Sequence, residues 1–183
     1  VWLTHGNDDI FVATRNGMGI RFNENDARPI GRTARGVKAI ELSEGDEVVS
    51  MQLTSQGEYV LVASEFGFGK LTDVNEFSAQ RRGGKGVICM KLTSKTKDLV
   101  GVVMVDESMD LMALTSSGKM IRVDMQTIRK AGRNTSGVIV VNVGSDEVVS
   151  IARCPKEESD DQDMDIIDDD FIAEQMAKIS EVE

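Results

Sequence analysis

The sequence predicts an all-β fold of three repeated units, each with about four short strands. Two observations predict it. A pair of glycine registers recurs with a period of 50 to 51 residues, and runs rich in Val, Ile and Met alternate with turn signals. A four-stranded unit of this length is typical of a propeller blade. Propellers close with ~4–8 blades, so three units predict an open arc or part of a larger disc.

Each unit contains an apolar run that ends at a glycine turn. The runs occupy residues 10–14, 60–64 and 111–115. The glycines that follow them are Gly17, Gly67 and Gly118. Asn-Gly and Ser-Gly are hairpin dipeptides, because glycine readily adopts a positive φ. We expect one blade each from residues 1–54, 55–106 and 107–154.

A second glycine lies 19 residues after the first in every unit, and a valine and a further strand-like run follow it. These glycines are Gly36, Gly86 and Gly137. The unit closes with Asp-Glu-Val-Val-Ser at residues 46–50, and the same five residues recur at 146–150. Two registers that repeat together indicate a true structural repeat.

The charge of the chain is unevenly distributed. Residues 156–183 hold 12 acidic and 2 basic side chains, so the whole net charge of −10 lies there and the rest of the chain is neutral. We expect residues 155–183 to be an acidic tail that is mostly disordered. The acidity of the whole chain therefore does not exclude a nucleic-acid partner for the body.

The segment between the two glycine registers is basic in every unit. It contains Arg28, Arg32 and Arg35 in the first unit, Arg81, Arg82 and Lys85 in the second, and Arg129, Lys130 and Arg133 in the third. Arg32, Arg82 and Arg133 all lie four residues before the second glycine. In a radial repeat, equivalent positions share one rim, which predicts a curved row of charges that fits a phosphate backbone. Aromatic residues make up only 4% of the chain, which favours a duplex over a stacked single strand.

The second unit carries the motif that identifies a relative. Its basic segment reads Gln80-Arg81-Arg82-Gly83-Gly84-Lys85-Gly86 and matches, at all seven positions, the signature box of the DNA gyrase A subunit. Residues 16–19 and 132–138 also resemble the C-terminal domain of that protein. The resemblance covers roughly residues 8–154, and an acidic tail is also typical of that family.

The resemblance implies a β-pinwheel, a propeller-like disc of six blades with strands exchanged between neighbours. Such a disc wraps duplex DNA without sequence preference and supports negative supercoiling. Its partners are the remainder of the gyrase A protein and the gyrase B protein, in a holoenzyme that needs ATP and Mg. It also implies a cytoplasmic, nucleoid-associated location in a bacterium. The family's box lies in the first blade, whereas one further unit follows it here, so the chain resembles blades four to six.

Other classes of protein remain open at this point. The C-terminal domain of topoisomerase IV is the nearest relative to exclude, and a protein-interaction propeller is a second alternative. A kelch-like module is disfavoured, because its recurring double glycine occurs only at Gly83-Gly84. We expect no catalytic residue, metal site, cofactor or membrane segment in this part of what would be a type II topoisomerase. The lone Tyr59 lies in a strand-like run and is expected to pack, and Cys89 and Cys154 are expected to be reduced thiols.

Overall fold

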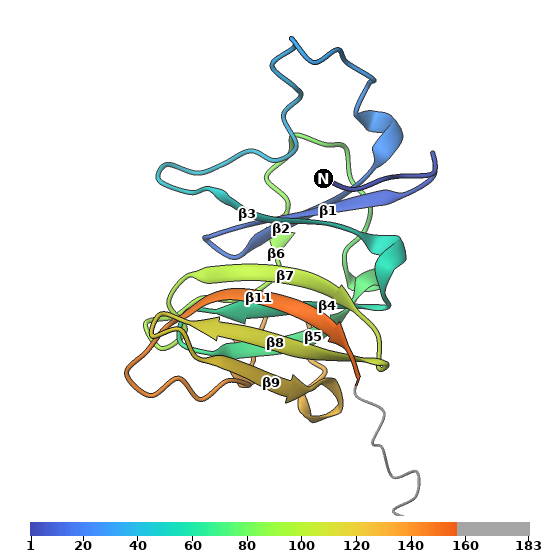
Figure 1. Ribbon diagram of the computed structural model, residues 1–183. Helices are drawn as coiled ribbons and strands as arrows, with labels where there is room; N and C mark the ends of the chain where they lie inside the picture. The colour runs from blue at the N-terminus through green and yellow to red at the C-terminus, as the bar shows by residue number, and fades with distance from the viewer. Residues whose placement is uncertain (157–183) are drawn as a thin grey trace, which may run out of the picture.

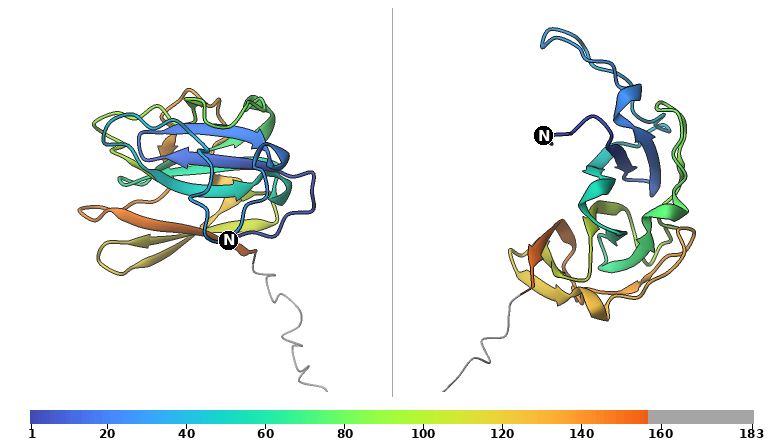
Figure 2. Two further views of the ribbon diagram at one scale, coloured as in Figure 1. Left: turned by 90° about the horizontal axis from the view of Figure 1, so that it is seen from above. Right: turned by 90° about the vertical axis from the view of Figure 1, so that its right-hand side faces the viewer.

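The computed structural model describes residues 1–156, which form three antiparallel sheets arranged along an arc (Figures 1 and 2). The first sheet has the order β3-β1-β2-β6, the second β10-β5-β4-β7 and the third β11-β8-β9. The strands are β1 (Asp9–Thr14), β2 (Met18–Asn23), β3 (Val48–Leu53), β4 (Tyr59–Ser64), β5 (Phe68–Asp73), β6 (Val87–Ile88), β7 (Leu99–Val105), β8 (Met109–Thr115), β9 (Met120–Asp124), β10 (Val138–Ile139) and β11 (Val148–Pro155). The predicted all-β, propeller-like fold is confirmed. In residues 1–156 no helix is long and apolar enough to cross a membrane.

The apolar runs become the central strands of the sheets. In β4, every residue from Val60 to Ser64 is buried, because this strand packs on both of its faces. One core lies between the first and second sheets, where Phe11 meets Phe77 edge to face at 4.9 Å. A second core, which includes Leu61 and Leu111, joins the second and third sheets. Stacking of neighbouring units therefore supplies the apolar burial that a single unit lacks.

A short 3-10 helix follows the second strand of each repeat. The helices are η1 (Glu24–Asp26), η3 (Val74–Glu76) and η4 (Met125–Thr127), and η2 (Thr54–Gln56) joins β3 to β4. One side chain caps each of η1, η3 and η4 and accepts a hydrogen bond from the backbone N–H two residues further on. These capping residues are Asn23, Asp73 and Asp124. The caps end the strand at the same place in each repeat and direct the chain into the basic segment.

The fourth strand of a sheet comes from the next repeat. β6 lies after the basic segment of the second repeat but pairs with β2 of the first, and β10 of the third repeat pairs with β5 of the second. This is the strand exchange that the resemblance implied. Within residues 1–156 the third sheet has three strands, and residues 37–39 of the first repeat, which correspond to β6, pair with no strand.

The second glycine register makes this exchange possible. Gly86 and Gly137 both adopt φ of +71°, and a Cβ on either would lie 2.4 Å from the carbonyl oxygen of Gly19 or 2.3 Å from that of Gly69. A Cβ cannot approach a backbone atom so closely. Gly36, whose segment has no sheet to pair with in the described residues, meets nothing within 4 Å. The repeated glycine thus allows backbone contact between neighbouring repeats.

Candidate nucleic-acid interface

The three basic segments follow the 3-10 helices as loops. We call residues 27–39 the first loop, 78–86 the second loop and 129–137 the third loop. In the right-hand view of Figure 2 the second and third loops, coloured green and orange, run along the outer side of the arc, whereas the first loop extends away from the sheets. The second and third loops thus lie on the same side of the arc, and the first loop does not.

The second loop, which holds the signature box, docks on the first repeat through its backbone. The N–H of Gln80 donates to the carbonyl of Arg21 at 2.8 Å, and the N–H of Gly83 donates to that of Ala39 at 2.6 Å. The N–H of Glu41 returns a bond to the carbonyl of Gly84 at 2.8 Å. These bonds hold the loop against the first repeat, with Arg81 and Lys85 exposed and Arg82 half-buried.

The two box arginines have different surroundings. The Arg82 guanidinium donates through Nε to the carbonyl of Asp26 at 2.7 Å and through Nη1 to that of Lys38 at 3.1 Å. The Arg81 side chain is exposed and has no hydrogen bond or ion pair within residues 1–156. Asp26, Arg81 and Arg82 line a pocket of about 330 Å³ that is open to solvent. Arg82 therefore fastens the loop, and Arg81 is available to a ligand.

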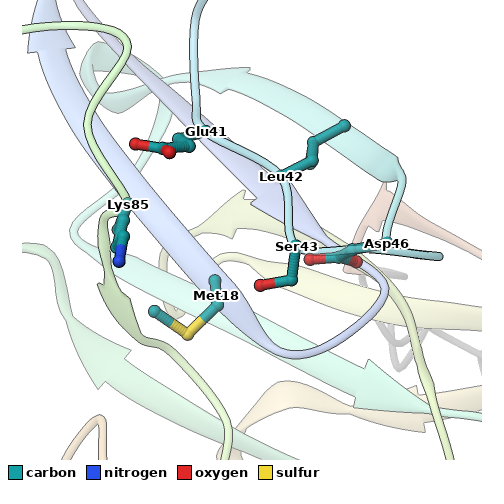
Figure 3. Close-up of a pocket in the computed structure, with 6 residues that line it drawn as sticks. All are labelled: Met18, Glu41, Leu42, Ser43, Asp46 and Lys85. Atoms are coloured by element: carbon teal, nitrogen blue, oxygen red, sulfur yellow. The ribbon is translucent and has the colours of Figure 1, made fainter.

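Lys85, the third basic residue of the box, lies beside a second pocket of about 270 Å³ (Figure 3). Glu41 stands close to it in the view, Met18 lies below, and Asp46 stands on the far side. Asp46 Oδ1 is engaged, because it accepts hydrogen bonds from the backbone N–H groups of Asn16 and Glu47. Lys85 itself is exposed and has no ion-pair partner in the described part of the chain.

The third loop docks on the second repeat in the same manner. The N–H of Leu71 donates to the carbonyl of Arg129 at 3.0 Å, and the N–H of Ala131 donates to the carbonyl of Leu71 at 2.9 Å. The backbone N–H of Arg133 donates to Oε2 of Glu76 at 2.9 Å. The Arg133 guanidinium has one long contact, 3.5 Å, to the carbonyl of Ile88. The side chain of Arg129 is exposed and unpaired within residues 1–156.

Lys130 is held by an internal contact. Its Nζ donates to Oε1 of Glu107 at 2.8 Å and to the Tyr59 hydroxyl at 2.9 Å, and it lies 4.3 Å from the centre of the Tyr59 ring. The hydrogen bond to Glu107 raises the pKa of Lys130 most, and the bond to Tyr59 adds to this effect, so the side chain stays protonated and positively charged. A phosphate would have to compete with Glu107 for this ammonium. Tyr59 packs on a strand, as expected, and also carries this contact.

The first loop presents its charges most freely. Arg28, Arg32 and Arg35 are exposed, and within residues 1–156 their side chains have no hydrogen bond or ion pair. The sequence treats Arg32, Arg82 and Arg133 as one repeated position, whereas in the structure Arg32 is free and the other two are half-buried with bonds to backbone carbonyls. The difference arises because the first loop has no preceding repeat to dock on among the described residues.

Sequence reasoning missed one residue of this region, Lys70 in β5. Its side chain is fully buried, and its ammonium contacts the third loop from below. A signal existed, because the repeats have isoleucine at the equivalent positions, Ile20 and Ile121. In residues 1–156 no group of three or more His, Cys, Asp and Glu residues is placed to hold a metal ion.

Comparison with known proteins decides the family. The family model described as DNA gyrase C-terminal domain, beta-propeller, matches residues 8–55, 58–106 and 110–155. The chain belongs to this family. The DNA gyrase A protein of Campylobacter fetus is 67% identical over 157 residues, and that of Campylobacter jejuni is 62% identical over the same length. Each match covers 85% of this chain and 18% of the relative, so the chain spans about a fifth of their length.

Solved structures agree on the gyrase C-terminal fold. A structure titled as the DNA gyrase A C-terminal domain superposes with a TM-score of 0.77 at 24% identity, over 82% of this chain and 52% of that one. The C-terminal domain of DNA topoisomerase IV gives a TM-score of 0.78 at 29% identity, over 84% of this chain and 49% of that one. The identities to the gyrase A sequences are far higher, so the chain is a gyrase A domain and not its topoisomerase IV counterpart.

Proposed function

We propose that this gyrase C-terminal domain binds duplex DNA through its phosphates and wraps it along the outer edge of the arc. In the whole protein this wrapping would serve negative supercoiling by a holoenzyme of the gyrase A and gyrase B proteins that uses ATP and Mg. The residues proposed to contact DNA are Arg28, Arg32, Arg35, Gln80, Arg81, Arg82, Gly83, Gly84, Lys85, Gly86, Arg129, Lys130 and Arg133. Gly84 and Gly86 would act through their backbone, which brings N–H groups close to the surface, whereas the N–H of Gly83 already donates to the carbonyl of Ala39 and this glycine would act by letting the loop approach closely.

One observation carries the proposal. Of the nine basic side chains proposed to contact DNA, six have no hydrogen bond or ion pair within residues 1–156. They are Arg28, Arg32, Arg35, Arg81, Lys85 and Arg129. Unpaired arginines and lysines on docked glycine loops match a phosphate backbone and offer little for reading bases. The proposed chemistry is therefore charge neutralisation, with no bond made or broken by this domain.

The salt dependence of binding tests the first part of the proposal. The six unpaired side chains alone predict a slope of about −5 for log K against log salt, and an affinity loss of about 10³-fold between 50 and 200 mM salt; each further contact, such as one from Arg133, steepens the slope by about 0.9. Anisotropy of labelled duplexes of unrelated sequence should give the same slope. Arg81→Ala should reduce the slope by about 0.9. Lys95→Ala, which removes the same charge from an exposed turn outside the three loops, is the matched control.

Wrapping needs a separate measurement. Nicked circular DNA that is sealed by ligase in the presence of the chain should show a changed linking number after the protein is removed. Binding without any change in linking number would restrict the function to attachment. A slope near zero, or a strong preference for one sequence, would refute phosphate binding itself.

A further inference from the structure

Lys70 is an unusual residue for the centre of a β-sheet. It lies in β5 with none of its side chain exposed, at the position held by isoleucine in the first and third repeats. A buried ammonium is costly unless all its protons find acceptors. Within residues 1–156 no carboxylate oxygen lies within 4 Å of its Nζ, so an ion pair does not compensate for its burial. Its acceptors therefore explain its presence.

All three acceptors belong to the third loop. Lys70 Nζ donates to the carbonyl of Gly132 at 2.7 Å, to that of Arg133 at 2.6 Å and to the hydroxyl oxygen of Thr135 at 3.2 Å. The Thr135 hydroxyl in turn donates to the carbonyl of Gly132 at 2.9 Å. One side chain thus satisfies three polar groups along four consecutive residues of the loop.

The backbone of Arg133 is held on both sides. Lys70 binds its carbonyl, and Glu76 at the end of η3 accepts from its N–H. The peptide groups around Arg133 are fixed by β5 and η3, so its guanidinium is not needed to fasten the loop. That guanidinium keeps only the 3.5 Å contact to Ile88.

The second loop is fastened differently. Ile20 lies against Gly84 and Gly86 of this loop, and its apolar side chain cannot donate a hydrogen bond. There the guanidinium of Arg82 itself makes the bonds to Asp26 and Lys38. In the second loop the repeated arginine acts as the fastener. In the third loop the buried Lys70 fastens the loop instead.

We propose that Lys70 is a positioning residue of the DNA interface, which fixes the third loop from below and so leaves the Arg133 guanidinium available to a phosphate. This inference rests on the proposed function. It adds to the interface a residue that never meets the DNA.

A double-mutant cycle tests the proposal. Lys70→Ile places in the second repeat the residue that the other two already have. If one phosphate contact is lost, affinity for a duplex at 0.1 M salt falls about 8-fold and the salt slope drops by about 0.9. Arg133→Ala should give the same loss, and the double variant should lose no more than either one. In an Arg32→Ala background, Lys70→Ile should multiply the loss, because Arg32 lies on another loop.

Hydrogen exchange gives a readout that does not depend on DNA. The amides of residues 131–137 should exchange faster in Lys70→Ile, while those of β4 stay protected. If Lys70→Ile does not fold, Thr135→Val removes one acceptor and should shift exchange and affinity in the same direction. Unchanged exchange, unchanged affinity, or a double variant with the product of both single losses would overturn the proposal. Absence of salt-dependent binding by the unaltered chain would instead refute the proposed function and leave the exchange result to decide the role of Lys70.

Discussion

Replacing Gly137 by alanine tests whether the close backbone approach holds the exchanged strand in place. A Cβ at Gly137 would lie 2.3 Å from the carbonyl oxygen of Gly69, and the residue has φ of +71°. The left-handed conformation costs an alanine about 1–2 kcal/mol. The clash also forces β10 away from β5. This movement would break the hydrogen bonds that the N–H groups of Val140 and Val141 donate to the carbonyl of Gly67. At about 1–1.5 kcal/mol for each of the two bonds, we expect a further loss of about 2–3 kcal/mol.

Gly118→Ala is the matched control, because Gly118 has φ of +82° and a Cβ there meets nothing within 4 Å. Thermal unfolding followed by circular dichroism separates the two costs. For a domain of this size 1 kcal/mol shifts Tm by about 2–4 °C, so Gly137→Ala should melt about 5–10 °C below Gly118→Ala. Equal melting temperatures would show that the loop docks without the close approach, and the explanation of the second glycine register would be wrong.

Three further predictions follow from the loops. Arg81→Ala removes a phosphate contact and Arg82→Ala releases the loop that carries it, so both should reduce the salt slope of DNA binding. Only Arg82→Ala should also lower stability, by about 1–2 kcal/mol in urea unfolding, because it removes two bonds to carbonyls. Among the cleavage sites in residues 1–155, trypsin should cut first at Arg32, Arg35 or Lys38 of the first loop, and mass spectrometry that finds Arg81 cut before these sites would contradict this. Desolvation lowers the pKa of the buried Lys70 to about 8, so above pH 8 the unfolded chain binds more protons than the folded one. The stability of the unaltered chain relative to Lys70→Ile should therefore rise by up to about 2–3 kcal/mol between pH 8 and 10.5. Burial raises the pKa of Cys89 to about 12, and this thiol interacts electrostatically with Lys70, so both proteins should carry Cys89→Ala in this comparison. A flat difference in urea unfolding would refute the assignment.

The repeat could be predicted from the sequence because its causes are local. Gly17 ends a strand and turns the chain through a positive φ, and such a need leaves a residue at a fixed interval. The capping residues Asn23, Asp73 and Asp124 recur at the same period for the same local reason, although the structure was needed to recognise them as caps. The partner of an exchanged strand left no such mark on the sequence. The run after Gly86 would look the same whether it joined its own sheet or the preceding one, so exchange entered only through the resemblance.

The roles of the basic residues were harder to predict for a related reason. Arg32, Arg82 and Arg133 occupy one position in the repeat, and sequence alone makes them equivalent. What distinguishes them is the surface beneath each loop. Arg82 meets the free carbonyls of Asp26 and Lys38, whereas the carbonyl of Arg133 is already bound by Lys70. Tertiary contacts of this kind depend on residues about 50 positions away.

The docking glycines and the basic side chains contribute to DNA binding at different levels. Gly86 and Gly137 fix each loop to the preceding repeat, so the spacing of the loops along the arc is the spacing of the sheets themselves. An arginine supplies one phosphate contact within that frame, worth about 0.9 in the salt slope. A glycine variant that releases a loop displaces all of its charges together. Gly137→Ala should therefore weaken DNA binding more than Arg133→Ala does. The reverse order would mean that the basic side chains contact the phosphates even when the loop is not docked on the preceding repeat.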